Sequence, residues 1–380
     1  MNFDLNEEQT MLQDALSRLL SDHYDFEKTR RRLQREELGW SREIWGRLAE
    51  LGLMAVPFAE EDGGLGGGPI EMMIIAQAFG AHLVAEPYLA TLVLCGTALR
   101  LSSNATLRAQ LVPEIAEGKL TAAFAHDEPN LRSPDAPRRA TKAHRQGETW
   151  LLSGTKSNVL HGASVERLFV TANTPEGTAI FVIDAASNGI ERRDYKTFDG
   201  LRAAEIRFSE TAIPDGNLLA LGAEADALVE QVLQHGIAFI GAEAVGLMRM
   251  LLDLTVEHLK TRKQFGQTLS RFQALQHRAV EMLVAREQAE SISLYATMMT
   301  RDADPIERRK AFAAAKAVIG GSARIVGQSA IQLHGGIGVT DEYRVGWGMK
   351  RLTMIEMMFG DMDHHLAALA DLGGFVSPAE

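Results

Sequence analysis

The sequence predicts an α+β protein with an N-terminal α-helical domain, a middle antiparallel β domain and a C-terminal four-helix bundle. Three observations support this order. Apolar residues recur with the helical period over residues 1–118, short β-like segments follow over residues 119–222, and the helical period returns over residues 223–380. A chain of 380 residues is also long enough for two or three packed units.

The N-terminal domain begins with a helix that has a recognisable cap. Asn6 precedes a run whose apolar residues fall on one face, and such residues cap helices well. In the stretch "SREIWGRLAELGLM", Ser41 is the expected cap of a further helix and Gly52 its stop. These signals predict a helical start to the chain.

The middle domain is predicted from short segments rich in β-branched and aromatic residues. They read "LTAAFAH", "WLLSGTK", "RLFVTANT", "TAIFVID", "GIERRDY" and "AAEIRFSETAIP", with turn signals such as Ser187-Asn188-Gly189 between them. Strands this short and closely spaced indicate a compact antiparallel barrel or sandwich.

Long helices are expected in the last domain, at Ala223–Arg262, at Phe272–Thr300 and in an alanine-dense third segment. Each has broad apolar coverage. Helices of this kind are packed on several sides, which in a bundle often includes other subunits.

Composition excludes several classes of protein. The formal net charge of −11 disfavours nucleic acid as a partner, because phosphate binding needs a basic surface. No stretch of the sequence approaches 18 consecutive apolar residues, so no membrane span is predicted. The N-terminus does not resemble a signal peptide. The single cysteine, Cys95, fits a reducing compartment, so a cytoplasmic location is expected.

Two segments of the last domain could bind a cofactor. "KTRKQFGQTLSRFQALQ" and "IQLHGGIGVTDEY" together offer a guanidinium for a diphosphate, an aromatic ring, two amides and glycines that admit an anion. The candidate residues for an ADP-like group are Arg262, Phe265, Gln273, Gln332, Gly335 and Gly336. Taken singly, each is weak, since a helix-end arginine is usually a surface residue and "HGGIG" is often only a C-cap turn.

These segments, together with "AFAHDEP" and "LSGTKSNVLHG", make the chain resemble the acyl-CoA dehydrogenase family over essentially its whole length. The resemblance implies FAD as cofactor, an acyl-CoA substrate oxidised between Cα and Cβ, and electron-transferring flavoprotein as acceptor. Several stretches, including "KRLTMIEMMFGD", are similar to small subunits of heteromeric bacterial enzymes that act on dicarboxylyl- or steroid-CoA thioesters.

The same resemblance locates the catalytic base, which removes the α-proton. Family members carry it either just before a glycine near the C-terminus or in the first bundle helix. The matching residues here are Phe359 and Ile237, and neither can accept a proton. Glu243 and Glu356 are alternative bases, although their helical spacing from those positions displaces both.

Positions that face the flavin in the family are also altered. Asp127 stands where a threonine is usual, and Asn158 and Leu160 replace a tryptophan and a threonine. We therefore expect the smaller, non-catalytic chain of an α2β2 enzyme that completes the FAD site of a second subunit. Two alternatives remain: a self-sufficient tetramer of identical chains with an atypical base, and a structural subunit with no cofactor role.

The stretch "MIEMMFGDMDHH" invites a metal site, but helix geometry favours another reading. Gly360 breaks a helix and Asp361 caps the next one. His364 and His365 are adjacent, so their side chains point about 100° apart on a helix and do not both join one ligand set. No metal is expected here.

Overall fold

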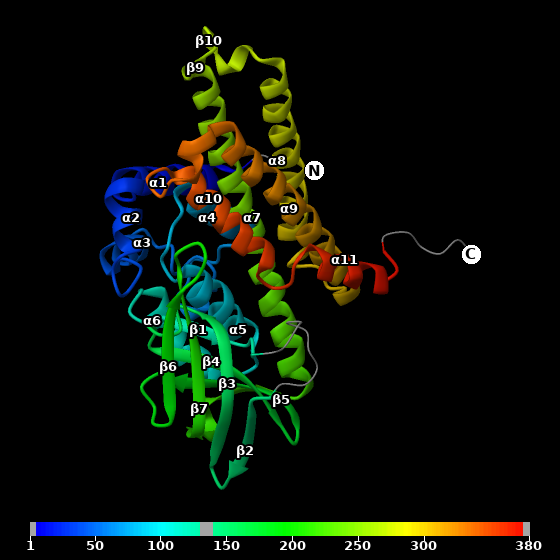
Figure 1. The fold of residues 1–380 in the computed structure, drawn as a ribbon. Coiled ribbons are helices and arrows are strands. Elements are labelled where there is room, and N and C mark those ends of the chain that lie inside the picture. The colour runs from blue at the N-terminus through cyan, green and yellow to red at the C-terminus, as the bar shows by residue number, and fades with distance from the viewer. Residues whose placement is uncertain (1–4, 130–139, 375–380) are drawn as a thin grey trace, which may run out of the picture. The chain divides into compact units, whose positions relative to one another are not determined.

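The computed structural model describes residues 5–129 and 140–374 of the chain. They form two compact units. One comprises Met1–Arg32, Pro69–Val84 and Ile237–Glu380, and the other comprises Leu33–Gly68 and Ala85–Gly236. Along the sequence the helix–sheet–helix order is as predicted (Figure 1).

The N-terminal helices start where their caps predict. The main ones are α1 (Glu7–His23), α3 (Arg42–Glu50), α4 (Pro69–His82), α5 (Gly96–Leu101) and α6 (Ala105–Ala116), with shorter helical turns at η1 (Phe26–Arg30), α2 (Arg31–Leu33), η2 (Glu60–Asp62) and η3 (Leu89–Cys95). The Asn6 side chain accepts from the backbone N–H of Gln9 at 2.8 Å, and the Gln9 side chain accepts from the N–H of Asn6 at 3.0 Å. This capping box satisfies two of the helix's orphan donors. The Ser41 hydroxyl caps α3.

The described residues of the β domain form one eight-stranded sheet. Its strands are β1 (Ala122–Ala125), β2 (Lys142–Gln146), β3 (Thr149–Leu160), β4 (Arg167–Thr174), β5 (Gly177–Asp184), β6 (Ile190–Lys196), β7 (Arg202–Pro214) and β8 (Leu218–Leu221), followed by a second pair formed by β9 (Lys263–Gln264) and β10 (Gln267–Thr268). The order is β6-β7-β3-β2-β4-β5-β8, and β1 pairs with β4. Its core packs Trp150 against Phe181, with ring centroids 5.4 Å apart.

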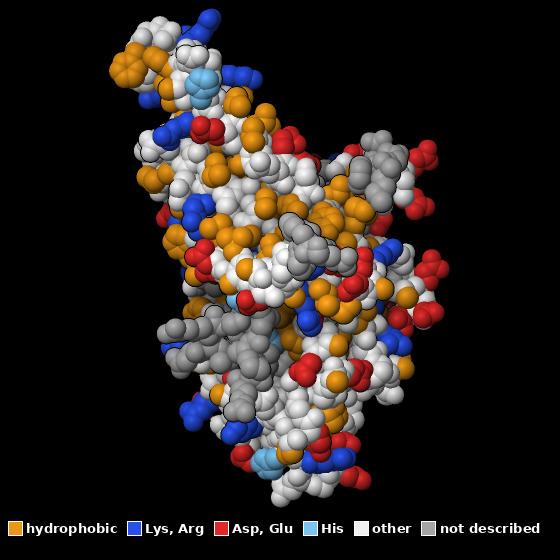
Figure 2. Space-filling view, turned by 90° about the vertical axis from the view of Figure 1, so that its right-hand side faces the viewer, with side chains coloured by type: hydrophobic (Ala, Val, Ile, Leu, Met, Phe, Trp, Pro, Cys, Tyr) orange, Lys and Arg blue, Asp and Glu red, His pale blue; other side chains and the backbone are white. Residues whose placement is uncertain are grey.

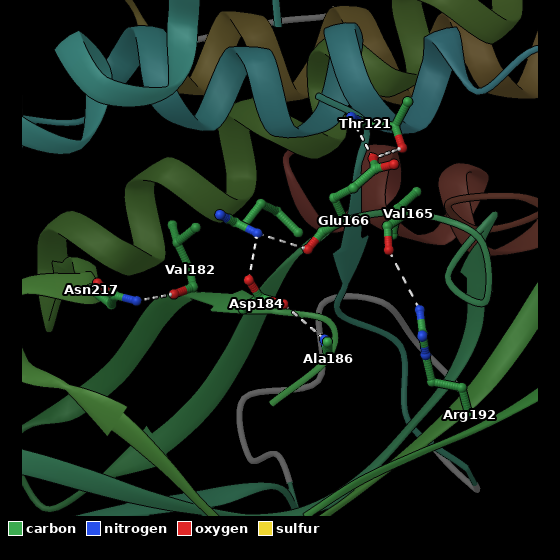
Figure 3. A network of polar contacts seen from close by, with 9 residues as sticks. Thr121, Val165, Glu166, Val182, Asp184, Ala186, Arg192 and Asn217 are labelled. Carbon is green, nitrogen blue, oxygen red and sulfur yellow. Dashed lines mark hydrogen bonds and ion pairs between the residues drawn. The ribbon is translucent and has the colours of Figure 1, made fainter. Parts of the chain in front are cut away.

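The sheet differs from the expected antiparallel arrangement in two pairings. Strand β4 runs parallel to β1 and to β2, while the other neighbours are antiparallel. A polar network fixes the start of β1 beside β4 (Figure 3). The Glu166 carboxylate accepts from the backbone N–H of Thr121 at 2.9 Å, and Asp184 accepts from Arg167 at 2.8 Å.

The C-terminal helices are α7 (Ala223–Thr261), α8 (Gln273–Met299), α9 (Pro305–His334), α10 (Arg344–Met357) and α11 (Met362–Asp371), with short turns at η4 (Asp215–Asn217), η5 (Leu269–Arg271) and η6 (Gly335–Val339). The two long helices predicted from periodicity are confirmed to within one residue at each end. Helices α8 and α9 lie side by side (Figure 1).

Close backbone packing joins α4 to α7. A Cβ atom at Gly80 would lie 2.0 Å from the Glu243 carbonyl oxygen, and one at Gly246 would lie 2.0 Å from that of Gln77. Only glycine allows this approach, so the two helices are held in a fixed register. That register positions Glu243, whose side chain is considered below.

The outer face of α8 carries exposed apolar side chains, including Val280, Leu283 and Val284. Hydrophobic side chains are visible among charged ones over this region of the surface (Figure 2). Among the described residues, no helix is both long and apolar enough to cross a membrane.

Candidate functional site

A cavity of about 880 Å³ opens where α7 and α9 end and α8 begins. Its walls come from the end of α7, the β9–β10 hairpin, the first turns of α8 and the turn that closes α9. The lining residues are His258, Arg262, Gln264, Leu269, Ala274, Leu275, Arg278, Gln332, Leu333, His334, Gly335, Gly336 and Ile337.

Local backbone geometry brings these segments together. The backbone N–H of Leu269 donates to the Arg262 carbonyl at 2.9 Å, which closes the hairpin onto the end of α7. At the end of α9, Gly335 has φ 64°, a left-handed conformation that a residue with a Cβ adopts only with strain. Beyond the neighbouring backbone, no atom of the described residues lies within 4 Å of a Cβ built at Gly335 or Gly336. The backbone there is therefore open to a ligand.

Four of the six predicted cofactor residues line this cavity: Arg262, Gln332, Gly335 and Gly336. Phe265 lies at the tip of the hairpin with 88% of its surface exposed, and its ring packs edge-on to that of Phe272 at 6.1 Å. Gln273 is the first residue of α8 and precedes the lining residue Ala274. These two residues lie beside the cavity and do not line it.

The electrostatic character of the cavity is cationic. Arg262 and Arg278 both line it, with His258 and His334, and no aspartate or glutamate is among the lining residues. Sequence reasoning missed Arg278 and His258. His258 could have been found from the sequence, because it precedes Arg262 by four positions and so lies on the same helix face. A cavity of this kind suits an anion such as a diphosphate.

Of the alternative bases, Glu243 is fully engaged. Its two carboxylate oxygens accept from the Arg351 guanidinium at 2.6 and 2.8 Å, and both side chains are buried. Proton abstraction by Glu243 would break two charge-assisted hydrogen bonds. This geometry makes Glu243 a structural anchor between α7 and α10.

Glu356 lies on the last turns of α10. Its carboxylate accepts from Arg324 at 3.3 Å, and its Cγ lies 3.2 Å from the Cβ position of Gly320 on α9. The side chain therefore packs over α9. A salt bridge to a half-exposed arginine holds it more loosely than Arg351 holds Glu243.

The segment around Phe359 has a backbone clamped from two sides. Lys316 donates to the carbonyls of Ile355 at 2.9 Å, Glu356 at 2.7 Å and Gly360 at 2.8 Å. His365 donates to the Phe359 carbonyl at 2.9 Å. These bonds hold Phe359 at φ 58°, an uncommon conformation for a large side chain.

The next contacts are those of Asp127, Asn158 and Leu160, the positions that the sequence predicted to face a flavin. The Tyr195 hydroxyl donates to the Asn158 side chain at 2.9 Å, and Asn158 has φ 51°. The Asp127 carbonyl accepts from the N–H of Ser157 at 2.9 Å. Leu160 ends β3. The side-chain oxygen and the backbone N–H of Asn158 are thus both hydrogen-bonded to Tyr195.

Next to these residues, a buried ion pair fixes the end of β1. Lys156 donates to Glu128 at 2.7 Å and to the hydroxyl of Thr171 at 3.1 Å, and the lysine is fully buried. Burial opposes the ionised form of Glu128, but Lys156 and the hydrogen bonds from Ala140 and Thr141 hold the pKa of that carboxyl below its ordinary value.

The "GDMDHH" stretch is structured as its helix signals predict. Gly360 has φ 92°, and the Asp361 side chain caps α11 by accepting from the N–H of His364 at 2.9 Å. No group of three or more His, Cys, Asp or Glu residues that could hold a metal occurs in the described part of the chain.

Comparison with known proteins gives the family. The N-terminal domain model of acyl-CoA dehydrogenases matches residues 6–119, and the C-terminal domain model matches residues 227–372. The chain belongs to the acyl-CoA dehydrogenase family, whose members are FAD-dependent oxidoreductases that act on acyl-CoA thioesters.

Individual relatives are distant but extend over the whole chain. A probable acyl-CoA dehydrogenase of Bacillus subtilis is 27% identical over 94% of this chain and 95% of its own length. An NADH-dependent acryloyl-CoA reductase of Anaerotignum propionicum is 25% identical over 97% of this chain and 95% of its own length. Among solved structures, the Tcur3481-Tcur3483 steroid ACAD has a TM-score of 0.88 at 26% identity, covering 96% of this chain and 97% of its own.

Proposed function

We propose that this chain is the smaller, non-catalytic subunit of a heteromeric FAD-dependent acyl-CoA dehydrogenase. Its cavity at the ends of α7 and α9 would hold the adenine–diphosphate end of an FAD whose flavin belongs to the second subunit. The supporting observation is an asymmetry: the chain keeps a cation-lined cavity for the nucleotide, whereas Phe359 and Ile237 stand where the family carries its base.

The residues in the cavity fit the diphosphate of FAD. Arg262 offers a planar fork of donors, Gln332 an amide, and Gly335 and Gly336 an unobstructed backbone. Phe265 and Gln273, beside the cavity, would contact the adenosine. FAD supplies the redox chemistry when bound, by accepting the hydride equivalent from the thioester. This chain's residues supply binding and orientation.

Two features of the β domain support a non-catalytic role. The Asn158 side-chain oxygen accepts a hydrogen bond from Tyr195, so this polar contact takes the place of the tryptophan that the family uses there. Asp127 would bring a carboxylate towards a reduced, electron-rich flavin and repel its charge. Both features disfavour a flavin ring seated in this chain.

The proposed assembly and substrate rest on likeness. The steroid acyl-CoA dehydrogenase (ACAD) described above is named after two components, Tcur3481 and Tcur3483. The present chain is similar to it over almost its full length. The narrower resemblance is to the small subunit of pimeloyl-CoA dehydrogenase. We infer an α2β2 complex in the cytoplasm that oxidises a dicarboxylyl- or steroid-CoA thioester and passes electrons to an electron-transferring flavoprotein.

The test is expression of the chain alone and together with a dehydrogenase chain that carries a glutamate at the base position. We expect little flavin and no turnover from the chain alone, and a yellow, active complex of both. Stoichiometric FAD and full turnover from the chain alone would overturn the proposal. That result would favour the self-sufficient enzyme with an atypical base. Loss of activity in Glu243→Gln or in Glu356→Gln would then identify the base.

A further inference from the structure

Two histidines form a pair in the wall of the cavity. His258, near the end of α7, and His334, at the end of α9, have ring centroids 4.5 Å apart with an interplanar angle of 32°. The His334 ring also lies 5.3 Å from that of Tyr343. Both histidines line the cavity that holds Arg262 and Arg278.

The hydrogen bond of His334 identifies its tautomer. Nδ1 lies 2.8 Å from the Ala330 carbonyl oxygen, and since a carbonyl only accepts, Nδ1 carries a proton. Nε2 is then an acceptor in the neutral ring, and no described residue forms a hydrogen bond with it, although the side chain is only 5% exposed. A buried polar atom without a partner costs free energy that a ligand or a proton can recover.

The surroundings of the pair favour the neutral rings. Burial lowers the pKa of His334 below its ordinary value, while the backbone carbonyls of Ala330 and Leu254 act against that shift. The Leu254 carbonyl favours the protonated ring without forming a hydrogen bond of ordinary geometry to Nε2. Burial, His334 and Arg262 together hold the pKa of His258 below its ordinary value.

The described residues that line the cavity include no negatively charged side chain. Within the described residues, the ionisable groups that line the cavity are His258 from α7, Arg262 directly after α7, Arg278 from α8 and His334 from α9. Each of them is a cation or becomes one on protonation. Tyr343, which packs on His334, is neutral near pH 7. A diphosphate in the cavity would reverse the local potential and remove the electrostatic opposition to a proton on the pair.

We propose that the His258–His334 pair is a further part of the diphosphate site and takes up a proton from solvent when the nucleotide binds. The proton goes to Nε2 of His334 or to the facing ring of His258, and no covalent bond changes. This inference rests on the proposed function, because it takes the nucleotide end of FAD as the ligand.

The experiment is calorimetric titration of the full chain with ADP-ribose. This probe carries the adenosine and the diphosphate but lacks the terminal phosphate of ADP, which would itself titrate near pH 6. Measurement in two buffers of different ionisation enthalpy gives the number of protons exchanged. We expect uptake of up to about one proton per site, and an affinity that falls by up to about tenfold per pH unit between about pH 6 and about pH 8.

Variants locate the proton. His334→Gln and the less buried His258→Gln should each reduce the uptake, whereas His277→Gln, an exposed residue of α8 outside the cavity, should not. Adenosine, which has no phosphate, should bind without proton exchange. ADP-ribose binding by the unmodified chain that is independent of pH, with no proton exchanged, would overturn this inference alone. Failure of both the chain alone and the flavin-stripped complex to bind ADP-ribose would overturn this inference and the proposed function together.

Discussion

Glu243 and Arg351, 108 positions apart in sequence, form a bidentate ion pair with oxygen–nitrogen distances of 2.6 and 2.8 Å. The pair joins α7 to α10 inside the helical unit, next to the close crossing of α4 and α7 at Gly80. It gives Glu243 a structural role, whereas the sequence offered it only as an alternative catalytic base, and it makes the stability of this unit depend on two buried charges.

Removal of one partner of this pair should be costly. Glu243→Ala leaves the Arg351 guanidinium buried without its anion, and the expected loss in free energy of unfolding is about 3–5 kcal/mol. Denaturant titration measures it. The double variant Glu243→Leu/Arg351→Met should recover most of the loss. Glu43→Ala, which removes an exposed pair with Arg47, is the matched control, with a change of about 1 kcal/mol or less. Equal effects of the two alanine variants would contradict the buried-pair interpretation.

Arg262→Ala should release FAD from the assembled complex. A hydrogen bond to a charged group contributes about 1.5–3 kcal/mol, so the affinity for FAD should fall about 10- to 100-fold. The flavin content of the purified complex and its recovery on titration with FAD measure this loss. Arg301→Ala changes an exposed arginine that does not line the cavity and should leave the flavin content unchanged. Unchanged flavin in Arg262→Ala would instead support a purely structural subunit.

The sequence predicted the elements whose signal is local. The capping box at Asn6 and the long periods of α7 and α8 depend on neighbours within a few residues, and the structure agrees with them. Strands β2 and β8 escaped prediction for opposite reasons. Residues Lys142–Gln146 are nearly all polar and exposed, and Leu218–Leu221 are uniformly apolar. Neither shows the alternation that identifies a strand; each is fixed by pairing with β3 or β5.

Contacts between distant segments set the rest of the site. Arg278 enters the cavity only because α8 folds back after the β9–β10 hairpin, which no periodicity predicts. The same holds for the bond between Tyr195 and Asn158, which depends on β6 and β3 both flanking β7. Recognition of a motif identified the candidate residues, but their partners follow from the topology of the chain.

His365 should make the folded chain lose stability as pH falls through mild acid. Burial, with smaller contributions from Lys316 and His364, lowers its pKa to about 4 against an ordinary 6.5. Below pH 6.5 the unfolded chain binds this proton first, so the contribution of His365 is complete above pH 6.5 and is lost as pH falls to about 4. His365→Gln keeps a donor for the Phe359 carbonyl and should flatten the dependence of unfolding free energy on pH in this window. His144→Gln, on the exposed strand β2, should not.

Lys316 should make the free energy of unfolding rise with pH on the alkaline side. Burial lowers its pKa to about 8 from an ordinary 10.5, with Glu356 and Asp361 acting against the shift. Between these values the unfolded chain binds a proton that the folded chain has released, so stability rises with pH by up to about 3 kcal/mol. Lys316→Met should remove this rise in urea titrations, beyond any uniform loss from its three carbonyl contacts, whereas the exposed Lys142→Met should retain it. An identical slope in Lys316→Met and the unmodified chain would show that the ammonium keeps its ordinary affinity for protons. Lys316, which donates to the carbonyls on either side of Phe359, would then stay charged throughout this pH range.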